Sequence, residues 1–290
     1  MSALPASVEG EAERRRSLLG FLSSNPGIGL AGLFLTFVAV ATFWPALLAM
    51  ADPIAADPLQ AQLPPSWEHW FGTDHLGRDV FSRVVHGARY SILIGVSAVA
   101  LAATVGSALG LLAGLSRGLV DEIITRFLDV VSAFPDLLLA LVLISFTGPG
   151  TTNLIFALGV AFIPRFARVV RAQTFVIARS GYVEQARTFG LSRTVLVLRH
   201  VLPHAVAQVP ILATIGLGTA IIGAAGLSFL GMGPQPPAPE WGAMLAEARN
   251  YLRVAWWIGV WPGLAITLNV IAISVLGRRW QAAFEGRRAG

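Results

Sequence analysis

The sequence contains no cysteine and no lysine, and charged side chains make up only 13% of its 290 residues. Without cysteine the chain can form no disulfide, no thiolate metal site and no cysteine nucleophile. Without lysine it cannot contain the glycine-rich, lysine-terminated loop with which many ATPases bind phosphate. All 21 basic residues are therefore arginines, and against 16 acidic residues they give a net charge of +5.

Apolar residues are abundant and lie in long blocks. Hydrophobic side chains make up 55% of the chain and the mean hydropathy is +0.68, which is too high for an ordinary soluble domain. The arginines lie in the gaps between these blocks and are not interleaved with aromatic residues, which argues against nucleic-acid binding. The composition predicts an all-α integral membrane protein.

Six blocks have the length of about 20 apolar residues that a membrane-spanning helix needs. They are residues 28–50, 90–114, 123–146, 152–172, 204–229 and 255–277. The third block contains Asp136 directly after Pro135, and an acid within a span is a candidate for a transport pathway. Asp136 could meet a substrate amine, pair with Arg126, or cap a helix that restarts after the proline.

The distribution of arginine predicts the orientation, because cytoplasmic segments are enriched in positive charge. A cytoplasmic N-terminus places 16 of the 21 arginines inside and leaves five outside: Arg78, Arg83, Arg89, Arg249 and Arg253. We therefore predict that both termini are cytoplasmic. The first apolar block is too long for a cleavable signal, and further spans follow it.

A polar segment between the fourth and fifth spans has the pattern of a helix, a turn and a second helix. Gly190 separates "YVEQARTF" from "LSRTVLVLRHV", and it suits the position after a helix, as Ser192 suits the first position of the next. Helical spacing predicts a partly apolar knob whose stripe consists of Tyr182, Ala186 and Phe189. The seven arginines between residues 165 and 199 leave open an amphipathic helix that rests on anionic lipid.

The order of residues in this segment resembles the coupling motif of ABC importer membrane subunits, E-A-A, three residues, Gly, nine residues, I-x-L-P. Here it is Glu184-Gln185-Ala186, Gly190 and His200-Val201-Leu202-Pro203, so Gln185 and His200 depart from the motif. The resemblance implies a cytoplasmic coupling segment, residues 179–203, that docks on an ATPase subunit. The residues expected to carry this role are Gly181, Tyr182, Glu184, Gln185, Ala186, Gly190, Leu202 and Pro203.

A second polar stretch, "FGTDHLGRDVFSRVVHGARYSILIG" (residues 71–95), leads into the second span. Gly72 and Gly77 mark turns, and Asp79 can pair with Arg83 one helical turn later. These residues predict a capped and salt-bridged start of the span. Metal binding by Asp74, His75, Asp79 and His86 is not predicted, because their spacing fits no diagnostic pattern.

This stretch is similar to a signature of the second permease subunit in peptide and nickel importers, G-T-D-x-x-G-R-D-x-x-S-R-x-x-x-G-A-R, and matches every specified position. Residues 224–245 and the last span resemble the same subfamily, most closely the dipeptide permease C subunits, although the tail "LGRRWQAAFEGRRAG" departs from it. The resemblance implies that a solute-binding protein docks on the outer segment that contains Gly72, Thr73, Asp74, Gly77, Arg78 and Asp79.

The resemblance implies the type I ABC importer permease fold and the following division of the chain. The parts are a cytoplasmic tail (1–26), a first transmembrane helix (27–50), an extracytoplasmic segment (51–89), a permease core (90–278) that includes the coupling segment (179–203), and a cytoplasmic tail (279–290).

The same resemblance implies a non-catalytic permease in the bacterial plasma (inner) membrane. The chain itself would bind no cofactor, because ATP and Mg²⁺ belong to two partner ATPase subunits. It would form a heterodimer with a homologous permease, in contact with membrane lipid and with an extracytoplasmic solute-binding protein. Dipeptides or short oligopeptides are the expected cargo, with haem, glutathione, nickel complexes or a secondary transporter as alternatives.

Three glycines in "GSALGLLAG" follow helical spacing, at positions 106, 110 and 114. Small residues at every fourth position let two membrane helices approach closely. The sequence predicts a close helix–helix contact here, either within the chain or against the second permease.

Overall fold

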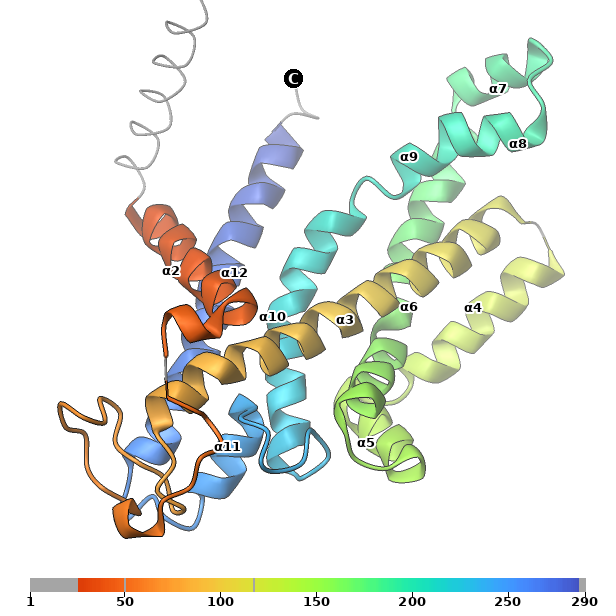
Figure 1. Cartoon of the computed structure of the whole chain (residues 1–290). Helices are drawn as coiled ribbons and strands as arrows, with labels where there is room; N and C mark the ends of the chain where they lie inside the picture. The colour runs from red at the N-terminus through yellow and green to blue at the C-terminus, as the bar shows by residue number, and fades with distance from the viewer. Residues whose placement is uncertain (1–25, 50, 117, 287–290) are drawn as a thin grey trace, which may run out of the picture.

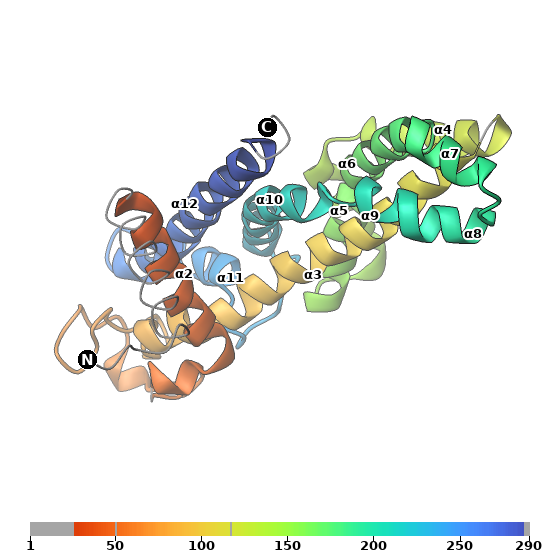
Figure 2. The ribbon, with the colours of Figure 1, turned by 90° about the horizontal axis from the view of Figure 1, so that it is seen from above.

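The computed structural model describes residues 26–49, 51–116 and 118–286, and these ranges contain helices and loops but no strand. The helices are α2 (Pro26–Phe43), α3 (Val80–Leu115), α4 (Leu119–Ser132), α5 (Asp136–Thr147), α6 (Thr151–Ile177), α7 (Gly181–Thr188), α8 (Arg193–Leu196), α9 (Leu202–Ala205), α10 (Val209–Phe229), α11 (Trp241–Ala248) and α12 (Trp257–Gly286). Figures 1 and 2 show α3 running between two groups, with α2 and α12 on one side and α4 to α8 on the other.

The six predicted spans correspond to α2, α3, α4 with α5, α6, α10 and α12, so the all-helical polytopic fold is confirmed. In the described part of the chain, α3, α6, α10 and α12 are each long and apolar enough to cross a membrane. Several boundaries differ from the prediction. The fifth span begins at Val209 and not at residue 204, and α12 continues to Gly286, well beyond residue 277.

The first span is shorter than predicted, because α2 ends at Phe43 and does not reach residue 50. Trp44 adopts φ −133° and ψ 59°, and a 3₁₀ turn, Pro45–Leu47, follows it. A proline disfavours the helical conformation of the residue before it, here Trp44, and supplies no N–H, which explains why the helix ends at Phe43.

The predicted third span, 123–146, is wrong as one continuous helix. The chain forms α4 and α5 instead, and the two are bent by 91° at the break between them. Pro135 causes the break, because it removes a backbone donor and disfavours the helical conformation of Phe134.

Asp136 is the first residue of α5, and its side chain is exposed. A helix that restarts after Pro135 is therefore confirmed, although Asp136 forms no capping hydrogen bond through its side chain. A carboxylate in the first turn still stabilises a helix, because the N-terminal end of the helix dipole is positive. The alternative in which Asp136 pairs with Arg126 is not observed, since Arg126 binds Glu122 at 2.7 Å.

The contact between α3 and α6 depends on the three glycines. A Cβ atom added at Gly106 would lie 2.7 Å from the Phe166 Cβ, and one at Gly110 would lie 2.4 Å from the Ala167 carbonyl oxygen. One at Gly114 would lie 2.6 Å from the Thr174 Cβ. The close contact is therefore within the chain, which joins α3 and α6 into one unit.

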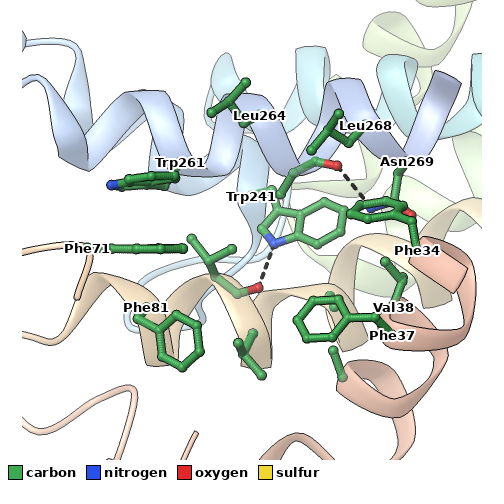
Figure 3. Close-up of a pocket in the computed structure, with 15 residues that line it drawn as sticks. Phe34, Phe37, Val38, Phe71, Phe81, Trp241, Trp261, Leu264, Leu268 and Asn269 are labelled. Atoms are coloured by element: carbon green, nitrogen blue, oxygen red, sulfur yellow. Dashed lines mark hydrogen bonds between the residues drawn. The ribbon is translucent and has the colours of Figure 1, made fainter. Parts of the chain in front are cut away.

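A second packed region joins α2, α3, α11 and α12 around a small apolar pocket of about 180 Å³ (Figure 3). Phe71 stacks on Trp261 with 3.9 Å between ring centroids, and the Trp241 Nε1 donates to the Val84 carbonyl at 2.8 Å. Asn269 is fully buried beside this pocket, and its Nδ2 donates to the Ala265 carbonyl at 2.9 Å. These contacts bring α11 and α12 to the first half of α3, and Ala41 of α2 packs in the same buried cluster.

Candidate functional site

The 179–203 segment forms a helical hairpin that projects from one end of the molecule, far from α11 (Figure 1). At its turn, Gly190 adopts φ +83°, which glycine reaches without steric cost. The Gly190 N–H donates to the Arg187 carbonyl at 3.0 Å and the Leu191 N–H to the Ala186 carbonyl at 3.3 Å. This pair of bonds is a Schellman motif, and it confirms the predicted end of the first helix at Gly190. Ser192 begins α8 as predicted, accepting from the Val195 N–H at 3.5 Å.

The hairpin packs on the ends of α3 and α6 through an apolar face. Val183, Leu196 and Val201 are buried there, and the side chains packed against them are Leu111, Leu115, Ile177 and Ala186. The prediction that Phe189 shares a stripe with Ala186 is not matched, since Phe189 is 83% exposed while Val183 is buried. The helix therefore turns Val183 and Ala186 toward the molecule, and Glu184, Gln185 and Phe189 lie exposed.

The second half of the hairpin continues toward α10 through a π turn, Val197–Val201, and through α9, which contains Leu202 and Pro203. The Leu202 N–H donates to the Val197 carbonyl, five residues back. Pro203 has no N–H to offer and crowds the carbonyl four residues before it, so a wider turn at this point relieves the contact. The Tyr182 hydroxyl donates to the His200 carbonyl at 3.0 Å and ties the two arms of the hairpin together.

The 51–89 segment lies at the opposite end and is held by the predicted turn residues. Gly72 and Gly77 have φ of +74° and +76°, and a Cβ at Gly77 would lie 1.8 Å from the Asp57 carbonyl oxygen. The Thr73 hydroxyl donates to the Gln60 carbonyl, and the Thr73 carbonyl accepts from the Trp257 Nε1 at 3.0 Å. The signature residues therefore anchor this segment to α12 and to its own first half.

A buried ion-pair network joins the same signature to α11. The Arg78 Nε lies 2.6 Å from the Asp74 Oδ2, and its Nη2 lies 2.7 Å from the Glu247 Oε2. Arg83 reaches the same two carboxylates at 3.5 Å and 3.2 Å. Both arginines are at most 2% exposed, and charges buried to this degree require such partners.

The predicted pair between Asp79 and Arg83 is wrong. Asp79 is instead the N-cap of α3, accepting from the Ser82 N–H at 2.8 Å and contacting the His69 Nδ1 at 2.9 Å. Sequence reasoning missed Glu247, although the signature has three arginines and only two aspartates, and this excess of arginine could have indicated that a further carboxylate is required.

The four residues considered for a metal do not come together, since His86 Nδ1 bonds the Ser82 carbonyl and Asp79 binds His69. Asp74, His75 and Glu247 do offer atoms within 4.8 Å of one another. Both carboxylates are already bound by arginine, and the two positive guanidinium groups oppose a cation at this point. The arrangement is a structural clamp.

Glu240 is a second buried carboxylate that sequence reasoning missed. It caps α11 by accepting from the Gly242 and Ala243 N–H groups at 3.0 and 2.8 Å, and the Ser91 hydroxyl donates to it at 2.9 Å. The residue is fully buried, and burial raises the pKa of the Glu240 carboxyl above its ordinary value of 4.5. The bond to Ser91 links the loop after α10 to α3.

The raised pKa makes stability depend on pH. The folded chain holds Glu240 in its neutral form more readily than the unfolded chain does, so this stabilisation is complete below pH 4.5 and is lost as the pH rises through the folded-state pKa. We expect the melting temperature of the detergent-solubilised chain to fall as the pH rises above 4.5. Glu240→Gln should make the melting temperature less dependent on pH. Identical pH slopes for the two proteins would contradict the assignment.

The fold and these two ends define the class of the protein: a multi-pass helical membrane subunit with a structured hairpin at one end and a braced, loop-rich segment at the other. Residues 106–290 match the family model described as "Binding-protein-dependent transport system inner membrane component". The chain belongs to this family, and it is the membrane-spanning permease subunit of an ABC importer.

Curated relatives agree with this family. The "Glutathione transport system permease protein GsiD" of Pectobacterium atrosepticum is 42% identical over 250 residues, which cover 85% of this chain and 82% of the relative. The "Probable D,D-dipeptide transport system permease protein DdpC" of Escherichia coli (strain K12) is 38% identical over 260 residues, 90% of this chain and 87% of the relative.

Solved structures show the same fold at low sequence identity. A chain of the inward-facing MetNI methionine ABC transporter has a TM-score of 0.59 and 20% identity, over 70% of this chain and 96% of that one. A chain of an amino acid ABC transporter has a TM-score of 0.56 and 14% identity, over 70% and 94%. These similarities confirm the ABC importer permease fold that the sequence predicts.

Proposed function

We propose that this permease imports dipeptides or short oligopeptides, including glutathione, which are delivered by an extracytoplasmic solute-binding protein. The names of the two relatives, which refer to glutathione and to a D,D-dipeptide, support this substrate class. The chain would form the translocation path as a heterodimer with a homologous permease. Both termini and the 179–203 segment would be cytoplasmic, which the distribution of arginine supports.

The observation that carries the mechanism is the hairpin of α7 and α8. Its inner face is packed on α3 and α6, and its outer face exposes Glu184, Gln185 and Phe189. An ATPase subunit that binds the exposed face would move the hairpin, and the packed face would transmit the movement to α3 and α6. ATP and Mg²⁺ would be bound by the two ATPase subunits.

At the opposite end, the clamp around Asp74, Arg78 and Glu247 would hold the 51–89 segment in a fixed shape. The residues that would meet the solute-binding protein are exposed apolar ones on this segment, Leu59 and Trp67, which are 95% and 97% exposed. Asp136, exposed at the bend between α4 and α5, is a candidate to meet a peptide amine along the path.

The docking proposal predicts that ATPase binding depends on the exposed face of α7. Phe189→Ala should weaken ATPase binding about 30-fold, because truncating an aromatic interface anchor costs about 2 kcal/mol, and Glu184→Arg should weaken it by reversing a charge. The measurement is copurification of the ATPase subunits with the assembled permease pair. Glu68→Arg, which reverses an exposed charge in the 51–89 segment, is the matched control and should leave copurification unchanged.

The substrate proposal is tested with the complete importer in proteoliposomes. Uptake and ATP hydrolysis should be stimulated by dipeptides or glutathione, and a panel with haem and nickel chelates distinguishes the other cargoes. Stimulation by haem or nickel alone would overturn the peptide assignment without affecting the docking proposal. Uptake that continues without the ATPase subunits would identify a secondary transporter.

A further inference from the structure

A pocket of about 470 Å³ lies between the hairpin and the turn that joins α3 to α4. Among the described residues that line it are three arginines, Arg179, Arg187 and Arg193, and none of these described residues is acidic. Apolar side chains form much of the remaining wall, among them Leu115, Val120 and Leu196. The pocket therefore combines concentrated positive charge with an apolar surface.

The two carboxylates at the start of α4, the helix that contributes Val120 to the pocket, are engaged elsewhere. Asp121 binds Arg171 through both carboxylate oxygens, at 2.6 and 2.7 Å. It also interacts electrostatically with Arg179. Glu122, the next acid along α4, binds Arg126 at 2.7 Å. Among the described contacts, Arg179 bonds the Phe175 carbonyl at 3.2 Å and lies over the Phe175 ring, so it keeps N–H groups for another acceptor.

The position of the pocket indicates the source of its ligand. It lies where α3 and α6 end, beside the start of α4, and both α3 and α6 can span the membrane. On α4, Leu119 precedes Val120 and Ile123 follows it by about one helical turn, and the two are 70% and 57% exposed. An exposed apolar surface next to an arginine cluster at the end of membrane spans fits a phospholipid, with its phosphate at the arginines and its chains along α4.

We propose that this pocket binds the phosphate headgroup of an anionic phospholipid from the membrane leaflet on the hairpin side. The apolar wall favours a lipid over an acidic side chain of a protein partner. A bound headgroup would bridge Arg187 on α7, Arg193 on α8 and Arg179 at the end of α6, and so fix the hairpin to the bundle. If the hairpin couples to ATPases, as proposed above, anionic lipid would strengthen that coupling.

The binding site is tested on the full-length chain without other subunits. Native mass spectrometry after exchange into mixtures of phosphatidylcholine and phosphatidylglycerol measures the number of retained anionic lipids and their affinity. Arg179→Gln, Arg187→Gln and Arg193→Gln should each weaken phosphatidylglycerol binding about fivefold, the effect of one arginine near an anionic surface. Arg199→Gln is the matched control, because this exposed arginine belongs to the same segment but does not line the pocket.

Several outcomes would overturn the proposal. Equal loss of lipid in Arg199→Gln and the pocket variants would show nonspecific charge attraction. Displacement of lipid by millimolar glycerol phosphate would identify a site for soluble phosphates. Unchanged lipid binding together with reduced ATPase copurification would assign the pocket to an acidic residue of the ATPase. The lipid measurement needs no ATPase, so its failure is distinguishable from failure of the docking proposal.

Discussion

Glu247→Ala is expected to destabilise the chain by about 3–5 kcal/mol, because it removes one of two carboxylates that offset two buried arginines. Arg78 and Arg83 are 2% and 1% exposed and lie 2.7 and 3.2 Å from the Glu247 Oε2. After the substitution, Asp74 alone would face the two buried guanidinium charges. The measurement is the free energy of unfolding in a detergent and denaturant titration.

Glu68→Ala is the control for this substitution. Glu68 lies in the 51–89 segment and is exposed, so its replacement should change stability by less than about 0.5 kcal/mol. A double substitution, Glu247→Ala with Arg83→Met, should recover part of the loss by removing one uncompensated charge. Equal stability of Glu247→Ala and the original chain would show that the network is not a clamp.

Gly110→Ala is expected to destabilise the chain by about 3 kcal/mol, the upper end of the usual range for overpacking. The added Cβ would lie 2.4 Å from the Ala167 carbonyl oxygen and 2.9 Å from the Arg171 nitrogen, and both are backbone atoms of α6. Backbone atoms cannot move aside alone, so α3 and α6 would have to separate along their length. The same unfolding titration measures the effect.

Gly226→Ala is the matched substitution for Gly110→Ala. Gly226 also lies inside a helix, α10, but a Cβ added there meets nothing within 4 Å. Because alanine is a better helix former than glycine, this variant should gain about 0.5–1 kcal/mol. If both variants changed stability equally, the distance between α3 and α6 would not depend on Gly110.

The Glu247 ion-pair network and the Gly110 contact are the places where α3 is held against α11 and α6. The hairpin packs on α3 and α6, the glycine contact joins those two helices, and the ion-pair network joins the start of α3 to α11. A movement at one end of α3 therefore reaches the other end through one continuous helix, Val80–Leu115. If the hairpin binds ATPase subunits as proposed, this continuity would link it to the 51–89 segment.

Local sequence patterns were sufficient to predict the spans, the hairpin turn and one helix–helix contact of this protein. Long apolar blocks predicted the spans, because a helix that crosses hydrocarbon must satisfy its backbone internally and cover it with apolar side chains. Gly190 predicted the turn of the hairpin, because only its backbone freedom allows φ +83° without strain. The spacing of Gly106, Gly110 and Gly114 predicted a close helix contact, because residues without a side chain let two helix backbones approach each other.

Contacts between distant residues required the tertiary structure. Arg83 pairs with Glu247, 164 residues away, and not with Asp79, because Asp79 caps the first turn of α3 by accepting from the Ser82 N–H. Phe189 is exposed and Val183 buried, because the direction of α7 is set by its packing on Leu111 and Leu115. Helical spacing states which residues share a stripe, but it does not state which stripe faces the protein.

The sequence by itself therefore determined the class of protein, the spans, the turns and the family, since these depend on composition and on residues close together in the chain. The tertiary structure decided the partners of the buried charges and the position of the arginine-lined pocket. Each of these arises where segments from different parts of the chain meet, and their geometry is set by packing between helices and not by local preference.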